Sequence, residues 1–251
     1  MNHDTPTLQA YLEMQRAFDY YNEQLFDGKL PQCLITFQRE RRTHGFFNGQ
    51  RFVNRNDNSM TDEIAMNPTF FGITPLSEIM QTLVHEMVHV WQHHFGNPGR
   101  GSYHNREWGD KMESLGLMPS RTGKEGGSKT GEYMLDYPIA GGKFSQVTEV
   151  LLSSGFQVSW LDRYPPVVPA DEVPEEDIAP TTTLAESTAG SAGFRQLLVP
   201  PSPVRKSNRV KYRCPVCKSQ VWGKADLNIL CAEPGCAASL YEAVLLTPTV
   251  S

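Results

Sequence analysis

Hydrophobic residues between positions 6 and 26 recur at the spacing of an amphipathic helix. They are Leu8, Tyr11, Leu12, Phe18, Tyr21, Leu25 and Phe26. Thr5 stands at the cap position, and Pro6 suits the first helical position. Gly28, just beyond the last of these hydrophobic residues, favours the end of a helix. The pattern therefore predicts a helix over residues 6–26.

Three short runs of β-type residues follow, at residues 34–37, 51–54 and 63–66, with glycine and asparagine turns between them. Apolar residues at helical spacing then predict a central helix over residues 75–94 and a further helix over residues 105–115. Helices together with a few short strands predict an α+β fold, with helices packed on a small sheet.

Residues 119–142 are rich in Gly, Ser and Thr, which predicts a long loop. The alternation over residues 143–160 predicts one or two more strands.

The composition changes near residue 165. Residues 165–203 are rich in Pro, Thr, Ala, Ser and acidic residues, and Arg195 is their one basic residue before Pro203. Such a segment buries too little apolar surface to offset the entropy of ordering it, so we expect a disordered acidic linker. This divides the chain into a domain of residues 1–164, the linker of residues 165–203, and a basic segment with a cysteine module at residues 204–251.

The net charge of −5 and the pI of about 5.8 argue against a general affinity for polyanions, so any contact with nucleic acid must come from a local basic patch. No apolar run approaches the roughly 18 residues of a membrane span, and the first residues do not resemble a signal peptide. Four of the five cysteines cluster near the C-terminus at the spacing of metal ligands, unlike a disulfide framework. We therefore expect a soluble cytoplasmic protein with no membrane partner.

The strongest chemical signal is the run His85-Glu86-Met87-Val88-His89 within the predicted central helix. Two histidines four residues apart on a helix lie one above the other and can bind one zinc ion. Glu86 then lies where it can act as general base toward a water molecule at the metal. By this motif we expect a catalytic zinc site.

A catalytic zinc of this kind needs a third protein ligand. His104 follows a glycine-rich turn that lets the chain reverse, so it is the favoured third ligand, with Glu107 in reserve. His93 and His94 continue the helix and are expected to point away from the metal, and His44 is isolated in the sequence. The sequence also leaves open which hydroxyl stabilises the oxyanion of the reaction, and the candidates are Tyr103, Tyr133 and Tyr137.

Cys214 and Cys217 form a C-x2-C pair, and Cys231 and Cys236 form a C-x4-C pair. Two such pairs can surround one tetrahedral zinc ion with four thiolates and leave no open position. The β-like residues near Val221 and at residues 228–230 suit the hairpins of a zinc ribbon. The expected cofactors are therefore one catalytic and one structural Zn²⁺.

A basic cluster surrounds this module. Its members are Arg205, Lys206, Arg209, Lys211, Arg213, Lys218 and Lys224. Tyr212 and Trp222 are interleaved with them and are expected to stack on bases. The cluster predicts a contact with nucleic acid, and the alternative is a solvated basic flank with no ligand.

The runs TLVHEMVHVWQHH and YHNREWGDKMESLGLMPS, together with YYNEQLFDGKLPQCLITFQR upstream, resemble the SprT-like (Spartan-type) metallopeptidase family over roughly residues 7–160. The resemblance implies a zincin-like domain, zinc ligands at His85, His89 and His104, and a catalytic glutamate at Glu86. Family members often carry glycine directly after the third histidine, and this chain carries Asn105 there.

Known members of this family include proteases that cleave proteins bound or crosslinked to DNA, and bacterial proteins of less certain role. With the basic cluster, the resemblance therefore implies a DNA-repair type of protease that acts on proteins on single-stranded or duplex DNA. The expected cytoplasmic location allows an association with the nucleoid. The alternative is a non-enzymatic zinc protein that binds nucleic acid or regulates a partner through an inactive peptidase fold. The presence of His85, Glu86 and His89 together argues against that alternative, because a site without catalytic activity does not require Glu86 as a general base.

Overall fold

A computed structural model describes residues 5–40, 43–101, 103–165, 198–199 and 209–243. The chain forms two compact units, Met1–Pro201 and Ser202–Ser251. Apart from residues 165 and 198–199, the predicted linker of residues 165–203 lies outside the described residues, so its disorder stays a prediction. The domain boundaries stay a prediction as well.

The first helix, α1 (Pro6–Phe26), has the predicted bounds. Its buried face includes Met14, Phe18 and Tyr21, at the helical spacing that the sequence shows. Thr5 lies at the cap position without a side-chain capping hydrogen bond. The hydrophobic spacing, rather than the cap, therefore accounts for this helix.

The larger sheet of this unit contains β1 (Leu34–Phe37), β2 (Gly45–Val53) and β3 (Met60–Met66) in the order β1-β3-β2. Strand β1 runs parallel to the central β3, and β2 runs antiparallel to it. All three predicted strands are present, and β2 begins at Gly45, earlier than expected. The register of β2 shifts between Asn48 and Phe52. Strand β2 is thus an edge strand with a bulge.

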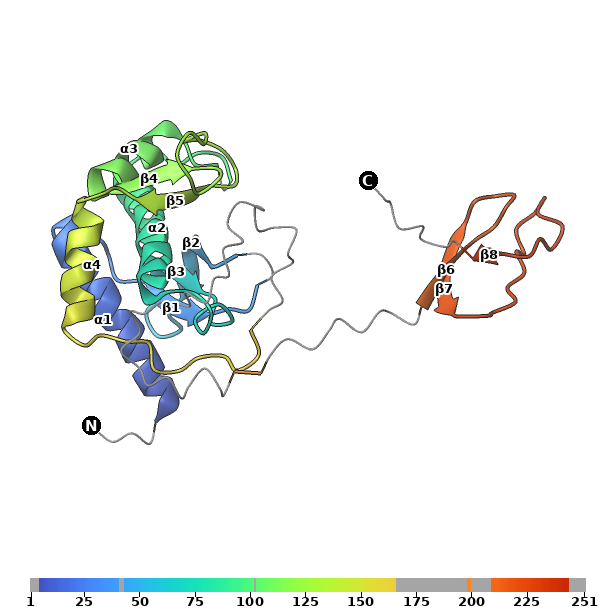
Figure 1. Cartoon of the computed structure of the whole chain (residues 1–251), viewed down its shortest axis with the longest axis horizontal. Helices are drawn as coiled ribbons and strands as arrows, with labels where there is room; N and C mark the ends of the chain where they lie inside the picture. The colour runs from blue at the N-terminus through green and yellow to red at the C-terminus, as the bar shows by residue number, and fades with distance from the viewer. Residues whose placement is uncertain (1–4, 41–42, 102, 166–197, 200–208, 244–251) are drawn as a thin grey trace. The chain divides into compact units, whose positions relative to one another are not determined.

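Helix α2 (Leu76–Phe95) is the centre of the unit. Figure 1 shows α2 between the β1-β3-β2 sheet on one side and α1 with α4 on the other. Half of its residues are buried, and Met80, Leu83, Val84, Met87 and Val88 are almost completely excluded from solvent. The core of the unit therefore forms around the helix that carries the His-Glu-His motif.

Helix α3 (Arg106–Leu115) starts directly after Asn105, whose side-chain oxygen accepts a hydrogen bond from the Trp108 backbone N–H at 3.0 Å. Gly116 ends α3 at φ 91°, and a Cβ there would approach the Lys143 backbone nitrogen to 2.7 Å. Glycine is therefore required by both the left-handed backbone and the available space.

The remaining elements of the unit depart from the sequence prediction. Strands β4 (Leu117–Ser120) and β5 (Leu135–Pro138) form an antiparallel pair, so the expected loop over residues 119–142 contains strand structure. The strands predicted within residues 143–160 are wrong, because α4 (Lys143–Ser153) occupies this segment. Its buried residues Phe144, Thr148 and Leu151 have helical spacing.

The second unit contains β6 (Arg209–Arg213), β7 (Gln220–Lys224) and β8 (Glu242–Ala243), in the order β7-β6-β8. The strand expected at residues 228–230 is reduced to an isolated bridge between Leu230 and Leu240.

The mixed helix and strand content confirms an α+β protein, and its zincin-like character stays a prediction. Among the described residues, no helix is both long and apolar enough to cross a membrane.

Candidate functional site

The structure brings three predicted ligands together. His85 and His89 lie one turn apart on α2, and His104 comes from the loop before α3. The Nε2 atom of His104 lies 3.1 Å from Nε2 of His89 and 3.3 Å from Nε2 of His85. Ligand nitrogens around a tetrahedral zinc, at about 2.05 Å from the metal, lie about 3.3 Å apart. The three rings therefore converge at the spacing of one zinc site.

The backbone around His104 explains how a loop histidine is placed so accurately. His104 and Gly131 form a two-way bridge, in which the His104 N–H donates at 2.8 Å and the Gly131 N–H donates back at 3.1 Å. Asn105 accepts from Gln92 Nε2 at 2.8 Å and donates to the Asn97 carbonyl at 2.9 Å. Asn105 thus ties the chain after His104 to the end of α2, which gives this departure from the family's glycine a structural role.

The outer nitrogens of two rings have protein partners. His85 Nδ1 lies 2.9 Å from Asp136 Oδ2, and His104 Nδ1 lies 3.1 Å from the Gly131 carbonyl oxygen. A hydrogen bond at Nδ1 fixes the tautomer whose Nε2 lone pair is available to a metal. Asp136, on β5, was missed at the level of sequence, because no local pattern links it to the histidines.

Aromatic side chains form the walls of this cluster. Trp108 is fully buried, and its ring centroid lies 4.4 Å from that of His104 and 4.8 Å from that of His85. Phe47 of β2 stacks on His89 at 6.3 Å. These rings restrict how the imidazoles can rotate, so the geometry is largely preorganised.

The charges of the cluster suit a metal cation. Burial lowers the pKa of His89 well below its usual value, and burial followed by the charge of His85 lowers the pKa of His104 to about 4. Both rings are therefore neutral at neutral pH, as metal ligands must be. Burial opposes protonation of His85 too, but the hydrogen bond to Asp136 and the charge of Glu86 outweigh it and raise the His85 pKa. The other oxygen of the Asp136 carboxylate, Oδ1, is buried and has no hydrogen-bond partner among the described residues. Three imidazoles beside this negatively charged group fit a divalent cation.

Glu86 lies on α2 directly after His85 and is only 5% exposed. Burial raises its pKa to about 7, against the opposing charge of His85. A Cβ on Gly45 would lie 3.3 Å from Glu86 Cγ, so the glycine lets β2 approach the helix closely at this point. Glu86 can therefore exchange a proton near neutral pH beside the histidine cluster.

Glu107, the reserve ligand, is occupied elsewhere. Its Oε2 atom accepts from the Asn97 backbone N–H at 2.6 Å and from Gln92 Nε2 at 2.9 Å. The hydrogen bond from Asn97 is the main cause of its lowered pKa. Glu107 thus fastens the loop after α2, and the structure does not bring it into the histidine cluster.

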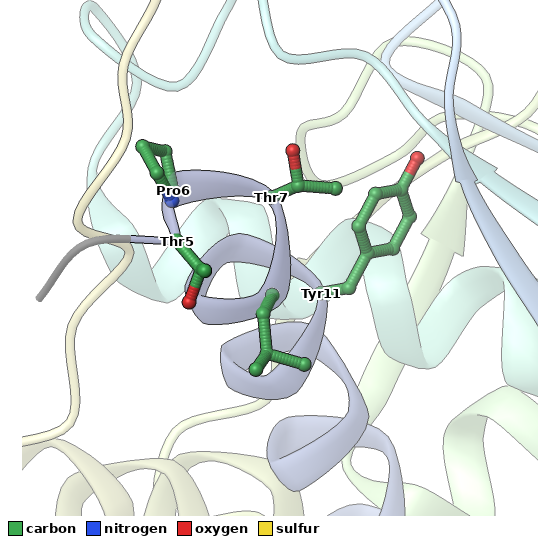
Figure 2. Close-up of a pocket in the computed structure, with 5 residues that line it drawn as sticks. Thr5, Pro6, Thr7 and Tyr11 are labelled. Carbon is green, nitrogen blue, oxygen red and sulfur yellow. The ribbon is translucent and has the colours of Figure 1, made fainter. Parts of the chain in front are cut away.

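The structure also shows the environment of His44 and of the three tyrosines considered as oxyanion stabilisers. His44 stacks on Phe70 at 4.1 Å, away from the cluster. Tyr133 is 84% exposed and Tyr103 is 43% exposed, so both hydroxyls are accessible, whereas Tyr137 is half-buried on β5. A shallow hollow at the start of α1, lined by Thr5, Pro6, Thr7, Leu8 and Tyr11, has no metal-ligating side chain (Figure 2).

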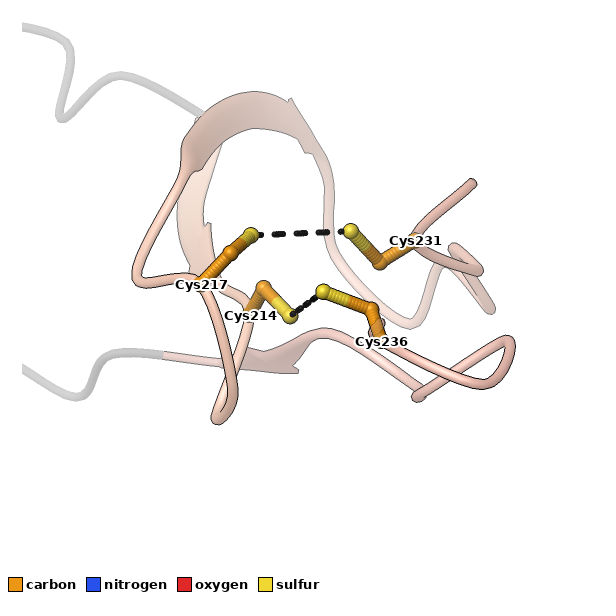
Figure 3. Close-up of side chains that lie close together, drawn as sticks. All are labelled: Cys214, Cys217, Cys231 and Cys236. Atoms are coloured by element: carbon orange, nitrogen blue, oxygen red, sulfur yellow. Dashed lines mark hydrogen bonds between the residues drawn. The ribbon is translucent and has the colours of Figure 1, made fainter. Parts of the chain in front are cut away.

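The four cysteines of the second unit point toward a common centre (Figure 3). The Sγ atoms of Cys214 and Cys236 lie 3.9 Å apart, and those of Cys217 and Cys231 lie 3.6 Å apart. Sulfur ligands of a tetrahedral zinc are about 3.8 Å apart, since each lies about 2.3 Å from the metal. All four are free thiols, so the donor set fits a closed tetrahedral metal site.

Four basic residues of this unit, Arg209, Lys211, Arg213 and Lys224, share one face of its sheet. Arg209 pairs with Lys224 and Lys211 pairs with Trp222 across β6 and β7, so these side chains lie on the same side. Trp222 is 61% exposed, and Lys211 Nζ lies 5.6 Å from its ring centroid. We call Arg209, Lys211, Arg213, Trp222 and Lys224 the basic face.

The other residues of the predicted basic cluster are not part of this basic face. Tyr212 is only 3% exposed and its hydroxyl donates to the Lys224 carbonyl at 2.7 Å, so the expectation that it stacks on bases is wrong. Lys218 lies in the turn after Cys217, where its Nζ donates to the Pro215 carbonyl. Arg205 and Lys206 lie outside the described residues.

The first unit is thus an α+β domain in which His85, His89 and His104 converge at the spacing of metal ligands. The buried Glu86 lies on α2, the helix that carries the first two histidines. The sequence model of the SprT-like family matches residues 14–125, which include all four of these residues. The chain is also 52% identical over 59 residues to an uncharacterized protein in the mucB 3′ region of Salmonella typhimurium, which is 24% of this chain and 80% of that protein. The chain belongs to the SprT-like family, a metallopeptidase-like family. No solved structure matches it.

Proposed function

We propose that the first unit is a zinc-dependent endopeptidase, in which His85, His89 and His104 hold the zinc ion and Glu86 transfers the proton. The observation that carries the proposal is the convergence of the three Nε2 atoms, with spacings of 3.1 Å and 3.3 Å to His104, beside a buried glutamate. Three imidazoles leave one coordination position open, as a catalytic zinc site requires.

When bound, zinc supplies a Lewis acid that acidifies water and polarises a carbonyl oxygen. Glu86 takes the proton of the attacking water and returns it to the leaving amine. Its pKa of about 7, raised by burial, suits both directions of transfer near neutral pH. Asp136 and Gly131 hold the rings of His85 and His104 in the ligating orientation.

Strand β2 offers a place for an extended peptide substrate. It is an edge strand of the sheet, so one side of its backbone is not paired within that sheet. Along its length, Gly45 approaches Glu86 and Phe47 stacks on His89. A peptide that adds to this edge as a further strand passes the histidine cluster, and its main-chain hydrogen bonds make recognition tolerant of sequence.

The substrates that we propose are proteins bound to DNA. Support comes from the basic face, where an exposed tryptophan lies among Arg209, Lys211, Arg213 and Lys224. An aromatic platform within a basic surface is suited to single-stranded nucleic acid, since bases stack on the ring and phosphates contact the cations. The cysteine site would hold a structural zinc that keeps this sheet folded.

The decisive experiment compares Glu86→Gln with wild type on a DNA-bound protein substrate. We expect Glu86→Gln to retain full zinc content while cleavage falls by about 10²-fold or more, because the proton acceptor is lost and the ligands remain. Glu78→Gln, at an exposed glutamate in the first turn of the same helix, is the control and should cleave normally.

Cleavage by Glu86→Gln at the wild-type rate would contradict the proposal. If wild type binds zinc and DNA but cleaves no protein with or without single-stranded DNA, the non-enzymatic alternative is supported instead.

A further inference from the structure

A second group of metal-ligating side chains lies outside the three-histidine cluster. Asp62 of β3 and His93 and His94 of α2 each offer a ligand atom, and these atoms all lie within 4.8 Å of one another. His94 Nε2 lies 2.6 Å from Asp62 Oδ2. Asp62 is buried, although it is a carboxylate. His93 and His94 lie outside the three-histidine cluster, as the sequence predicted, and their ligand atoms gather instead around the carboxylate of Asp62.

The bulge of β2 is shaped around this group. Gln50 adopts a positive φ of 49°, and its backbone N–H donates to Asp62 Oδ1 at 2.7 Å. A non-glycine residue in this region is strained, and such strain persists where surrounding contacts maintain it. A Cβ on Gly49 would lie 2.6 Å from His93 Cε1, so the glycine makes room for the His93 ring.

A simple ion pair does not account for the whole arrangement. The contact between His94 and Asp62 explains the positions of those two residues. It gives no role to His93, whose ring lies against the bulge and 5.6 Å from the centroid of Phe47. Asp62, His93 and His94 place three possible ligand atoms close together. Asp62 Oδ1 is already held by the Gln50 N–H, and such an outer hydrogen bond is typical of carboxylates that bind a metal ion.

We propose that Asp62, His93 and His94 bind a second divalent ion in this unit, of the borderline class that includes Zn²⁺ and Co²⁺. Two imidazoles and one carboxylate suit these ions and leave further positions for water. The side chain of His94 is 33% exposed, so an ion can enter from solvent. A bound ion joins the last turn of α2 to β3, one helical turn beyond His89. The proposal is independent of the proposed peptidase activity.

The test starts from the full chain with its cysteine and three-histidine sites loaded with zinc. Titration with Co²⁺ should give a visible d–d absorption that saturates at one added equivalent. The absence of cobalt–thiolate charge-transfer bands shows that the cysteine site has kept its zinc. Asp62→Asn and His93→Ala should each abolish this uptake. Asp57→Asn, an exposed carboxylate in the neighbouring turn, and His44→Ala are the matched controls and should bind Co²⁺ as wild type does.

Gly49→Ala provides a variant that removes no ligand. The added methyl group must displace the His93 ring, so the Co²⁺ affinity should fall by about tenfold or more while the content of pre-loaded zinc is unchanged. This zinc content also reports whether each variant is folded. The proposal is overturned if wild type takes up no added Co²⁺, or if folded His93→Ala and Gly49→Ala bind Co²⁺ as tightly as wild type.

Discussion

His85 Nδ1 and Asp136 Oδ2 are 2.9 Å apart and join the central helix to strand β5. The same segment is fixed by Gln81, one turn earlier on α2, whose Nε2 donates to the Asp136 backbone carbonyl at 2.8 Å. Asp136 is therefore held at both its side chain and its main chain. The orientation of one proposed zinc ligand depends on a residue about 50 positions further along the chain.

Replacement of Asp136 by alanine should weaken zinc binding at the three-histidine site by about 10- to 100-fold, because the His85 ring loses the partner that fixes its tautomer. Competition with a chelator of known affinity measures the change. Asp110→Ala, an exposed carboxylate on α3, is the matched control. An unchanged affinity in Asp136→Ala would show that His85 is oriented by packing alone.

The third ligand can be assigned by metal content. His104→Ala should lose the zinc of the first unit and keep that of the cysteine site, so the pre-loaded zinc falls by one equivalent. Glu107→Ala should keep both ions, because its carboxylate binds the loop at Asn97 and Gln92 rather than the cluster. Loss of zinc from a folded Glu107→Ala protein, with retention in His104→Ala, would reverse the assignment.

Binding of single-stranded DNA should depend on the basic face. Trp222→Ala should weaken binding by about 1 kcal/mol or more, which is roughly fivefold, because one stacking platform is lost. Lys211→Ala should weaken it less and should also reduce the salt dependence, because one phosphate contact is removed. Fluorescence anisotropy of a labelled oligonucleotide measures both.

Trp160→Ala serves as control, since Trp160 is an exposed tryptophan of the other unit. Equal affinity of the Trp222 and Trp160 variants would place DNA binding elsewhere.

Removal of metal should affect the two units differently. In the second unit, Cys214, Cys231 and Cys236 are almost its whole buried core, so a strong chelator should unfold it. The first unit has a large apolar core built from α1, α2 and their neighbours, and it should remain folded. Amide NMR signals report each unit separately. Dispersed signals from residues 209–243 after zinc removal would contradict a structural role for the metal.

The elements that the sequence predicted well are those with strong periodic patterns. Helix α1 has its predicted bounds, and α2 and α3 begin and end within a residue of theirs. Strand β5 could not be anticipated, because its four residues gain stability from pairing with β4 rather than from their own pattern. Helix α4 was misread because a short apolar segment can fit both periods.

The residues of the candidate site also differ in how far the sequence could predict them. His85, Glu86 and His89 form a local motif, and His104 follows a recognisable turn, so all four could be named in advance. Asp136 and Asp62 could not, because each reaches its histidine only through tertiary packing. Side chains that orient ligands carry no spacing rule along the chain.

Helix α2 provides the proposed chemistry from one side and the hydrophobic core from the other. Met80, Leu83 and Met87 are buried on the same helix as His85 and His89. Because a packed helix moves as a unit, a substitution that shifts one of these buried side chains also shifts the two imidazoles. Screens for thermal tolerance and screens for turnover should therefore return overlapping sets of positions along this helix. Engineers who wish to alter one property without the other will have better prospects at the loop that supplies His104 and at strand β5, which supplies Asp136.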